Sequence, residues 1–183
     1  MKKPFEFALL VGRFQMLHIG HEDMIRRALG SAKKVAVLIG SSNECGTAKN
    51  PFSYELRAEL LRKVFGDRIL IAPLPDIHLG NVPGWGEYVL ETCVKEFGRM
   101  PDLFVTGKEP RRESWFTGPN GRGIAELEIP KTIEVSASEE REAMLRGDRA
   151  AWEAYTNPAL HPEFERLRAI VEEAQSRTET GSI

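Results

Sequence analysis

Short apolar runs alternate with amphipathic segments along this chain of 183 residues, and that alternation constrains its fold more than any other feature. The runs have the length of buried strands, and the segments between them repeat apolar residues at helical spacing. Strands that alternate with helices in this way form a parallel sheet with helices on its faces. The expected strands cover residues 5–11, 35–39, 68–72, 103–106 and 132–135.

These strands predict a single α/β domain, a doubly wound, Rossmann-like parallel sheet with the strand order 3-2-1-4-5. Two or three C-terminal helices close the chain, the last over about residues 158–174. The domain is therefore expected to span residues 1–175, and the polar residues 176–183 are expected to form a disordered tail. Ligands of such sheets bind beyond the carboxyl ends of the strands, so the residues that follow the strands are the candidates for a site.

The charge balance narrows the range of partners. A formal net charge of -2 gives no reason to expect nucleic acid or an anionic membrane as a partner. No apolar stretch has the length of a signal peptide core or a membrane span. Cys45 and Cys93 lie far apart without metal-type spacing, so we expect both to be reduced. The expectation is a cytoplasmic protein that binds small molecules; the sequence leaves open whether it forms a homo-oligomer.

The turn after the first strand carries the most informative pattern, Gly-Arg-Phe-Gln-Met-Leu-His-Ile-Gly-His over residues 12–21. Gly12 allows a sharp turn where a ligand approaches the backbone. His18 and His21 can face one spot if a helix begins just after His18, where free N–H groups and the helix dipole favour an anion. Arg13 adds a planar charge suited to phosphate oxygens. The pattern predicts a phosphate site without a Walker motif.

Two other interpretations of the histidine pair remain open. Histidines three residues apart can hold zinc, although the sequence suggests no third ligand nearby. They can also lie on a solvated helix face without a function. The glycines and Arg13 directly after an apolar strand favour the phosphate interpretation over both.

This turn resembles the His-x-Gly-His signature of the nucleotidylyltransferase superfamily, in the Gly-Arg-Phe-Gln form of the nicotinamide-nucleotide adenylyltransferases. The resemblance implies that His18 and His21 contact the phosphates of ATP and stabilise charge in the transition state. Met16 stands where that family usually has proline. This change should make the loop less rigid without removing a phosphate contact.

A second phosphate-binding segment is expected after the last predicted strand. Ser136 and Glu139 have the spacing of a capping box, which indicates the start of a helix. The segment resembles the second motif of the superfamily, a Ser/Thr-rich turn that leads to a helical arginine, here Arg141. Glu140 departs from that motif, in which an apolar residue is usual, and its carboxylate could weaken the charge of Arg141 or face solvent. A charged helix start without a function is the open alternative.

Further segments resemble the acceptor region of the same family. Residues 40–43 and 50–57 are similar to the segments that follow its second strand, and residues 74–77 and 82–85 to a region where a tryptophan stacks on the nicotinamide ring. An aromatic plate suits a flat pyridinium through stacking and cation–π attraction. The alternatives are that Trp85 only begins the apolar face of its helix and that Asp76 only caps its loop.

Residues 107–123 are rich in Gly, Pro and Arg, and we expect a mobile surface loop near the site. Whether this loop closes over substrate stays open. Gly107-Lys108 and Ser114-Trp115-Phe116 resemble the version of the enzyme found in bacterial bifunctional proteins with an appended Nudix hydrolase. The glutamate-rich Nudix box is missing here, so no hydrolase activity is expected.

Taken together, the resemblance implies adenylyl transfer from ATP to nicotinamide mononucleotide (NMN), giving NAD and pyrophosphate. Mg²⁺ would be held by phosphates and water, so no metal-ligating side chains are expected. Alternatives are another acceptor (nicotinate mononucleotide, FMN or phosphopantetheine) and a catalytically weak nucleotide-binding regulator. The implied residues are His18, His21, Arg13 and Arg141 for catalysis, Gly12, Phe14, Gly20, Gly107, Ser136 and Ser138 for nucleotide binding, and Asn43, Asp76 and Trp85 for the acceptor.

Overall fold

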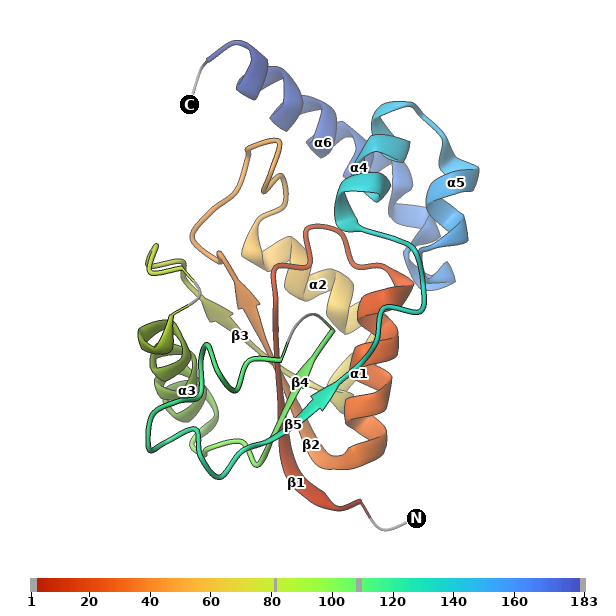
Figure 1. The fold of residues 1–183 in the computed structure, drawn as a ribbon. Coiled ribbons are helices and arrows are strands. Elements are labelled where there is room, and N and C mark those ends of the chain that lie inside the picture. Colours follow the sequence, from red (N-terminus) through yellow and green to blue (C-terminus); the bar gives the residue numbers. More distant parts are fainter. Residues whose placement is uncertain (1–2, 81, 108–109, 182–183) are drawn as a thin grey trace.

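The computed structural model describes residues 3–80, 82–107 and 110–181. In this part of the chain five parallel strands form a sheet with the order β3-β2-β1-β4-β5 (Figure 1). The doubly wound sheet and its strand order are as predicted. The strands are β1 (Phe5–Gly12), β2 (Ala32–Gly40), β3 (Leu70–Leu74), β4 (Leu103–Thr106) and β5 (Ala125–Glu128).

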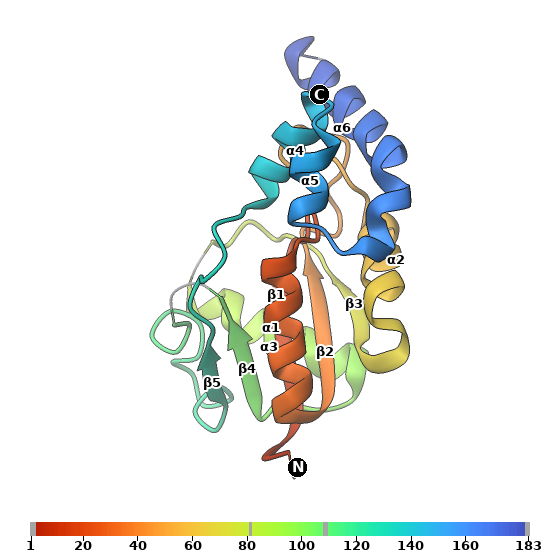
Figure 2. The ribbon, with the colours of Figure 1, turned by 90° about the vertical axis from the view of Figure 1, so that its right-hand side faces the viewer.

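The helices form three groups around this sheet. Figures 1 and 2 show α1 and α2 on one face, α3 on the other, and α4, α5 and α6 beyond the carboxyl ends of the strands. The helices are α1 (Ile19–Ser31), α2 (Tyr54–Phe65), α3 (Pro83–Phe97), α4 (Ala137–Leu145), α5 (Arg149–Ala154) and α6 (Phe164–Glu179), with short 3-10 helices η1 (Gly66–Arg68) and η2 (Pro158–Glu163).

Each face of the sheet buries its own apolar core. Successive side chains of a strand point to opposite faces. Ala8 and Leu10 of β1 therefore pack in the core beneath α1 and α2, while Phe7 and Leu9 pack in the core beneath α3. Both faces of β1 are thus covered, and β1 is also the middle strand of the sheet. Its carboxyl end is therefore held in a fixed position.

The predicted fifth strand is wrong in position. The strand that pairs with β4 is Ala125–Glu128, not residues 132–135. β5 lies at the edge of the sheet and its side chains are only partly buried, so it lacks the apolar run typical of the central strands. Residues 132–135 follow Pro130 and lead into α4 without strand pairing.

The loop between β4 and β5, expected to be a mobile surface loop near the site, is anchored to the core by a few of its side chains. Arg111, Trp115 and Phe116 are buried, and both aromatic rings belong to the core beneath α3. The backbone of Trp115 lies so close to α3 that a Cβ on Gly86 would fall 2.0 Å from its carbonyl oxygen. Lys108 lies outside the described residues.

The C-terminal region differs in detail from the predicted helix over residues 158–174. The segment begins with the 3-10 helix η2, which contains Pro162, and α6 starts at Phe164. Proline lacks the N–H that a continuous α-helix requires there. Helix α6 continues to Glu179, four residues past the predicted end of the domain at 175. Across the described ranges, no helix combines the length and the apolar character needed to cross a membrane.

Candidate active site

A cavity of about 540 Å³ opens at the carboxyl ends of β1 and β4, between the start of α1 and the start of α4. It lies where ligands bind in doubly wound sheets. Residues 132, 133 and 135, which were mistaken for a strand, line one side of it. The cavity brings together all four residues predicted to be catalytic and all six predicted to bind nucleotide: Gly12, Arg13, Phe14, His18, Gly20, His21, Gly107, Ser136, Ser138 and Arg141.

The two histidines stack on each other at the beginning of α1. His18 is the N-cap residue of this helix, so the helix begins where the phosphate interpretation requires. The centroids of the two imidazole rings lie 3.8 Å apart with an interplanar angle of 28°. The Phe14 ring lies against His21 at 4.9 Å. His18 is 8% exposed, and among the described residues its Nδ1 has no hydrogen-bond partner.

Two glycines make room for these rings. A Cβ on Gly20 would lie 3.1 Å from Cε1 and Nδ1 of His18, and a Cβ on Gly12 would lie 3.0 Å from the Phe14 ring. Such distances are tighter than ordinary packing, so a side chain at either position would displace the ring. Phe14 itself adopts a left-handed conformation with φ of 51°, which costs conformational energy for a residue with a Cβ. The backbone of this turn therefore leaves the space that the rings of Phe14 and His18 occupy.

His18 is neutral near pH 7. The pKa of its imidazole is lowered to about 4, mainly by burial and also by the charge of nearby Lys131, while Glu139 acts in the opposite direction. A neutral imidazole carries one N–H and acts as a hydrogen-bond donor without a full charge. The positive charge of the cavity therefore comes from other side chains.

Arg141 reaches across from α4 to the turn before α1. Its Nη1 donates to the backbone oxygens of Gln15 (2.7 Å) and Ala137 (3.1 Å), and its Nη2 donates to Oγ of Ser138 (3.2 Å). None of these acceptors is a carboxylate. Burial lowers the pKa of Arg141, and the charge of Arg13 lowers it further, but an arginine stays protonated.

Three more cations, Arg13, Lys131 and Arg111, line the same cavity. Arg13 is exposed, and its Nη1 donates to Oδ1 of Asn50 at 3.3 Å. Lys131 was not predicted from the sequence; it stands between β5 and α4 and forms an exposed ion pair with Glu134. The guanidinium of Arg111 lies over the Trp115 ring, 4.8 Å from its centroid. Four cationic side chains around one cavity produce a field suited to a polyanion such as a triphosphate.

Glu140 adopts neither of the two positions that the sequence suggested. Its side chain is 2% exposed and accepts a hydrogen bond from Oγ1 of Thr156 at 2.9 Å. Burial raises the pKa of its carboxyl group to about 7, an effect that the bond from Thr156 opposes and Glu139 reinforces. It therefore neither faces solvent nor appears among the hydrogen-bond partners of Arg141. Met16, the other departure from the family pattern, is fully buried in the core.

Two buried residues that the sequence analysis did not single out hold the turn in place. Gln15 exchanges two hydrogen bonds with the backbone of Phe52, at 3.0 and 2.9 Å. Arg57 is fully buried and donates to the backbone oxygens of Arg13, Gly40 and Ser41 at 2.8, 2.8 and 3.0 Å. Both residues lie inside segments that resemble the family, so the motifs could have indicated that they matter. The sequence did not show that their side chains bind backbone atoms of distant loops.

Asn43, Asp76 and Trp85, the predicted acceptor residues, do not line this cavity. Asn43 exchanges two hydrogen bonds with the backbone of Asp76, at 2.7 and 3.2 Å, and thereby joins the loops after β2 and β3. Trp85 stands at the start of α3 and meets the edge of Trp115 at 6.3 Å between centroids. Trp115 does line the cavity, so it connects Trp85 to it.

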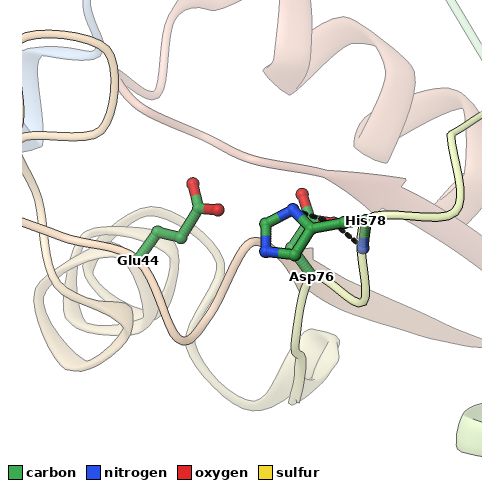
Figure 3. A group of neighbouring side chains, drawn as sticks. All are labelled: Glu44, Asp76 and His78. Atoms are coloured by element: carbon green, nitrogen blue, oxygen red, sulfur yellow. Dashed lines mark hydrogen bonds and ion pairs between the residues drawn. The ribbon is translucent and has the colours of Figure 1, made fainter.

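A group of possible metal ligands lies beside the acceptor residues. Figure 3 shows Glu44, Asp76 and His78, whose ligand atoms lie within 4.8 Å of one another. Asp76 already accepts hydrogen bonds from Oγ of Ser41 (3.2 Å) and from the backbone N–H of His78 (2.8 Å). Glu44 accepts from Nδ2 of Asn50. The group therefore braces the two loops, and we assign no metal to it.

The fold and the cavity define a nucleotidyltransferase of the cytidylyltransferase-like class, whose family model matches residues 9–111. The chain is 34% identical over 173 residues to the nicotinamide-nucleotide adenylyltransferase of Aeropyrum pernix, with 90% of each chain covered. It is 31% identical over 167 residues to the enzyme of the same name from Thermococcus onnurineus, covering 88% of this chain and 83% of that one. The chain belongs to the nicotinamide-nucleotide adenylyltransferase family.

A solved structure shares the fold. The bifunctional NMN adenylyltransferase/ADP ribose pyrophosphatase from Francisella tularensis, in its complex with AMP and a Mn ion, superimposes with a TM-score of 0.77 at 20% identity. The match covers 96% of this chain and 53% of that chain, so this chain spans about half the length of the bifunctional protein. At this identity the likeness concerns the fold alone.

Proposed function

We propose that the protein transfers the adenylyl group of ATP to NMN, producing NAD and pyrophosphate. The observation that carries the proposal is the cavity at the carboxyl ends of β1 and β4, where a stacked histidine pair meets four cationic side chains. The family membership supports the acceptor, because the relatives are named for nicotinamide nucleotide.

In the proposed reaction a phosphate oxygen of NMN attacks the α-phosphorus of ATP. The bond from that phosphorus to the bridging oxygen breaks, and pyrophosphate leaves with the electron pair. The attacking oxygen is already anionic near pH 7, so no general base is required. The protein accelerates the step by holding the two substrates in line and by stabilising the charge that develops on the phosphates.

The residues of the cavity divide this task. His18 and His21 lie at the N-terminus of α1, where the helix dipole favours an anion, and donate hydrogen bonds to phosphate oxygens. A neutral His18 suits this role. Its low pKa keeps the imidazole in one protonation state around pH 7, so its single N–H can donate over that whole range. Arg13, Arg141 and Lys131 supply the positive charge that the leaving pyrophosphate requires.

The acceptor is proposed to lie toward α3. Trp85 would stack on the pyridinium ring of NMN, with Asn43 and Asp76 at the loops that follow β2 and β3. The contact between Trp85 and Trp115 supports this direction, because it joins the aromatic start of α3 to the wall of the cavity.

ATP is proposed to enter as its Mg²⁺ complex, with the ion bound to phosphate oxygens and water. Mg²⁺ commonly keeps several waters and binds through the phosphates of its nucleotide. Asp23 is the one carboxylate among the described residues that line the cavity, and it is paired with Arg27 at 2.8 Å. The cationic lining therefore suits the nucleotide's phosphates, and the ion is part of the substrate.

The test is an acceptor assay with purified protein and Mg–ATP. NMN, nicotinate mononucleotide, FMN and phosphopantetheine are offered separately, and pyrophosphate release and dinucleotide formation are measured. We expect NAD and pyrophosphate in equal amounts with NMN, at a higher kcat/KM than with any other acceptor. Preferred use of another acceptor would contradict the assignment of NMN. ATP binding without turnover on any of them would instead indicate a nucleotide-binding regulator.

A further inference from the structure

The segment between α5 and η2 ties together the two helices that carry the proposed phosphate ligands. This segment, residues 155–157, is called the strap here. The backbone oxygen of Tyr155 accepts a hydrogen bond from the N–H of Ile19, the first residue of α1, at 2.9 Å. Nδ2 of Asn157 donates to Oε2 of Glu22 on α1 at 2.8 Å. Oγ1 of Thr156 donates to Oε2 of Glu140 on α4 at 2.9 Å.

Both carboxylates that accept hydrogen bonds from the strap are buried. Each is also next in the sequence to a residue proposed to bind phosphate. Glu22 is 5% exposed and directly follows His21 on α1. Glu140 is 2% exposed and directly precedes Arg141 on α4. The strap therefore binds α1 through two hydrogen bonds and α4 through one. Each of the three bonds is made by a residue that is next in the sequence to a residue of the cavity.

A buried carboxyl group is an expensive way to pack two helices. Taking it out of water costs more than burying an apolar side chain of similar volume, and a single neutral hydrogen bond does not fully compensate. Burial raises the pKa of Glu140, which reflects this cost. Directional hydrogen bonds nevertheless fix an orientation that apolar contacts leave free. The pair of Glu140 and Thr156 is thus better suited to orienting α4 than to stabilising the fold.

We propose that Thr156 and Asn157 are positioning residues that hold Arg141 of α4 at the correct distance and angle from the histidine pair of α1. The inference rests on the proposed function, since it assigns both helices to one ATP triphosphate. Neither residue lines the cavity, so they act through Glu140 and Glu22 and do not touch the nucleotide. Losing the strap should weaken the grip on ATP while leaving the acceptor region unchanged.

The experiment measures steady-state kinetics of the full chain with Mg–ATP and NMN. Thr156→Val removes the donor to Glu140, and we expect the KM for ATP to rise about tenfold, the size of one lost buried hydrogen bond. The KM for NMN should stay within about twofold, because Asn43, Asp76 and Trp85 are not touched. Thr156→Ser keeps the hydroxyl and should restore the wild-type KM for ATP. Tyr155→Phe, in the strap itself, is the matched control and should change neither constant, because Tyr155 bonds α1 through its backbone oxygen and its side chain is exposed.

Asn157→Ala provides a second variant that decides the matter if Thr156→Val does not fold. It removes the partly buried tie to Glu22 and should raise the KM for ATP by about threefold to tenfold. The inference is overturned if the folded variants keep the wild-type KM for ATP, or if the KM values for ATP and NMN rise equally. Wild-type protein that forms no NAD would instead show that the proposed function itself is wrong.

Discussion

The turn at the start of α1 and the loops after β2 and β3 differ in how their side chains are held. His18, His21 and Arg141 converge on one cavity and are at least partly buried. Asn43 and His78 are exposed, and Asn43 is fixed mainly by its hydrogen bonds to Asp76. The loop that contains Asp76 also exposes large apolar side chains, among them Ile77 and Leu79.

This difference suggests a division of labour. Phosphates are the same in every nucleotide, so a rigid turn with fixed donors can serve them before any substrate arrives. An acceptor ring is recognised by side chains on loops, which adapt more readily on binding. We therefore expect substitutions in the turn to affect turnover most, and substitutions around Trp85 to affect acceptor affinity most. The following predictions test that contrast.

The largest effect is expected from the histidine pair. His18→Ala or His21→Ala should each reduce kcat by about 100-fold or more, the scale of losing one donor to the transition state. The measurement is initial velocity at saturating Mg–ATP and NMN, with circular dichroism to confirm folding. Wild-type kcat in a folded variant would contradict the role assigned to the pair.

Next in size is the acceptor side. Trp85→Ala should raise the KM for NMN by about tenfold, corresponding to the loss of stacking and cation–π attraction. The KM for ATP should change little, and Trp85→Phe should retain most of the affinity because it keeps an aromatic ring. If both KM values rise together, Trp85 serves only the apolar face of α3.

A smaller effect is expected where a side chain would crowd His18. Gly20→Ala places a Cβ 3.1 Å from the imidazole, and the displaced ring should lower kcat by roughly fivefold. Gly30→Ala is the matched control, because it lies in the same helix with nothing within 4 Å of the added Cβ. The control should keep kcat and raise the free energy of unfolding by about 0.5–1 kcal/mol. Equal kinetics of the two variants would mean that the ring position does not matter.

The smallest effect concerns the buried carboxyl group of Glu140. The pKa of this group is raised from an ordinary 4.5 to about 7 in the folded state. Between these two pH values the folded state therefore keeps the proton that the unfolded state has lost. Stability is therefore lost as the pH rises from 4.5 to 7. Glu140→Gln removes this loss and keeps an oxygen for Thr156.

At pH 8 we expect Glu140→Gln to be more stable than wild type by roughly 1 kcal/mol, or about 2–4 °C in Tm, and at pH 5 the gap should shrink. Thermal unfolding at both pH values measures it. A gap that stays constant or widens toward pH 5 would show that Glu140 does not hold a proton in the folded protein.

The sequence predicted the sheet and the phosphate turn because both depend on local patterns. The central strands are apolar runs, and His18, Gly20 and His21 are close enough in the chain for their common direction to follow from helix geometry. The edge strand β5 was misplaced because its alternating polar residues lack that signal. An edge strand is defined by the neighbour it pairs with, which the sequence does not display.

Long-range partners explain the remaining differences. Glu140 meets Thr156 sixteen residues later, and Arg57 meets the backbone of Arg13 forty-four residues earlier. Such contacts depend on how helices pack, so spacing along the chain could not distinguish a buried Glu140 from a solvated one. The position of Trp85 relative to the cavity depends in the same way on the buried loop that carries Trp115.

The central claim is that the N-terminus of α1 and Arg141 of α4 hold one nucleotide triphosphate between them. A crystal structure of the protein with Mg²⁺ and a non-hydrolysable ATP analogue tests it most directly. We predict phosphate oxygens within hydrogen-bond distance of His18, His21 and Arg141, in the cavity at the carboxyl ends of β1 and β4. A triphosphate bound elsewhere, or one that leaves both imidazoles without contact, would contradict the account.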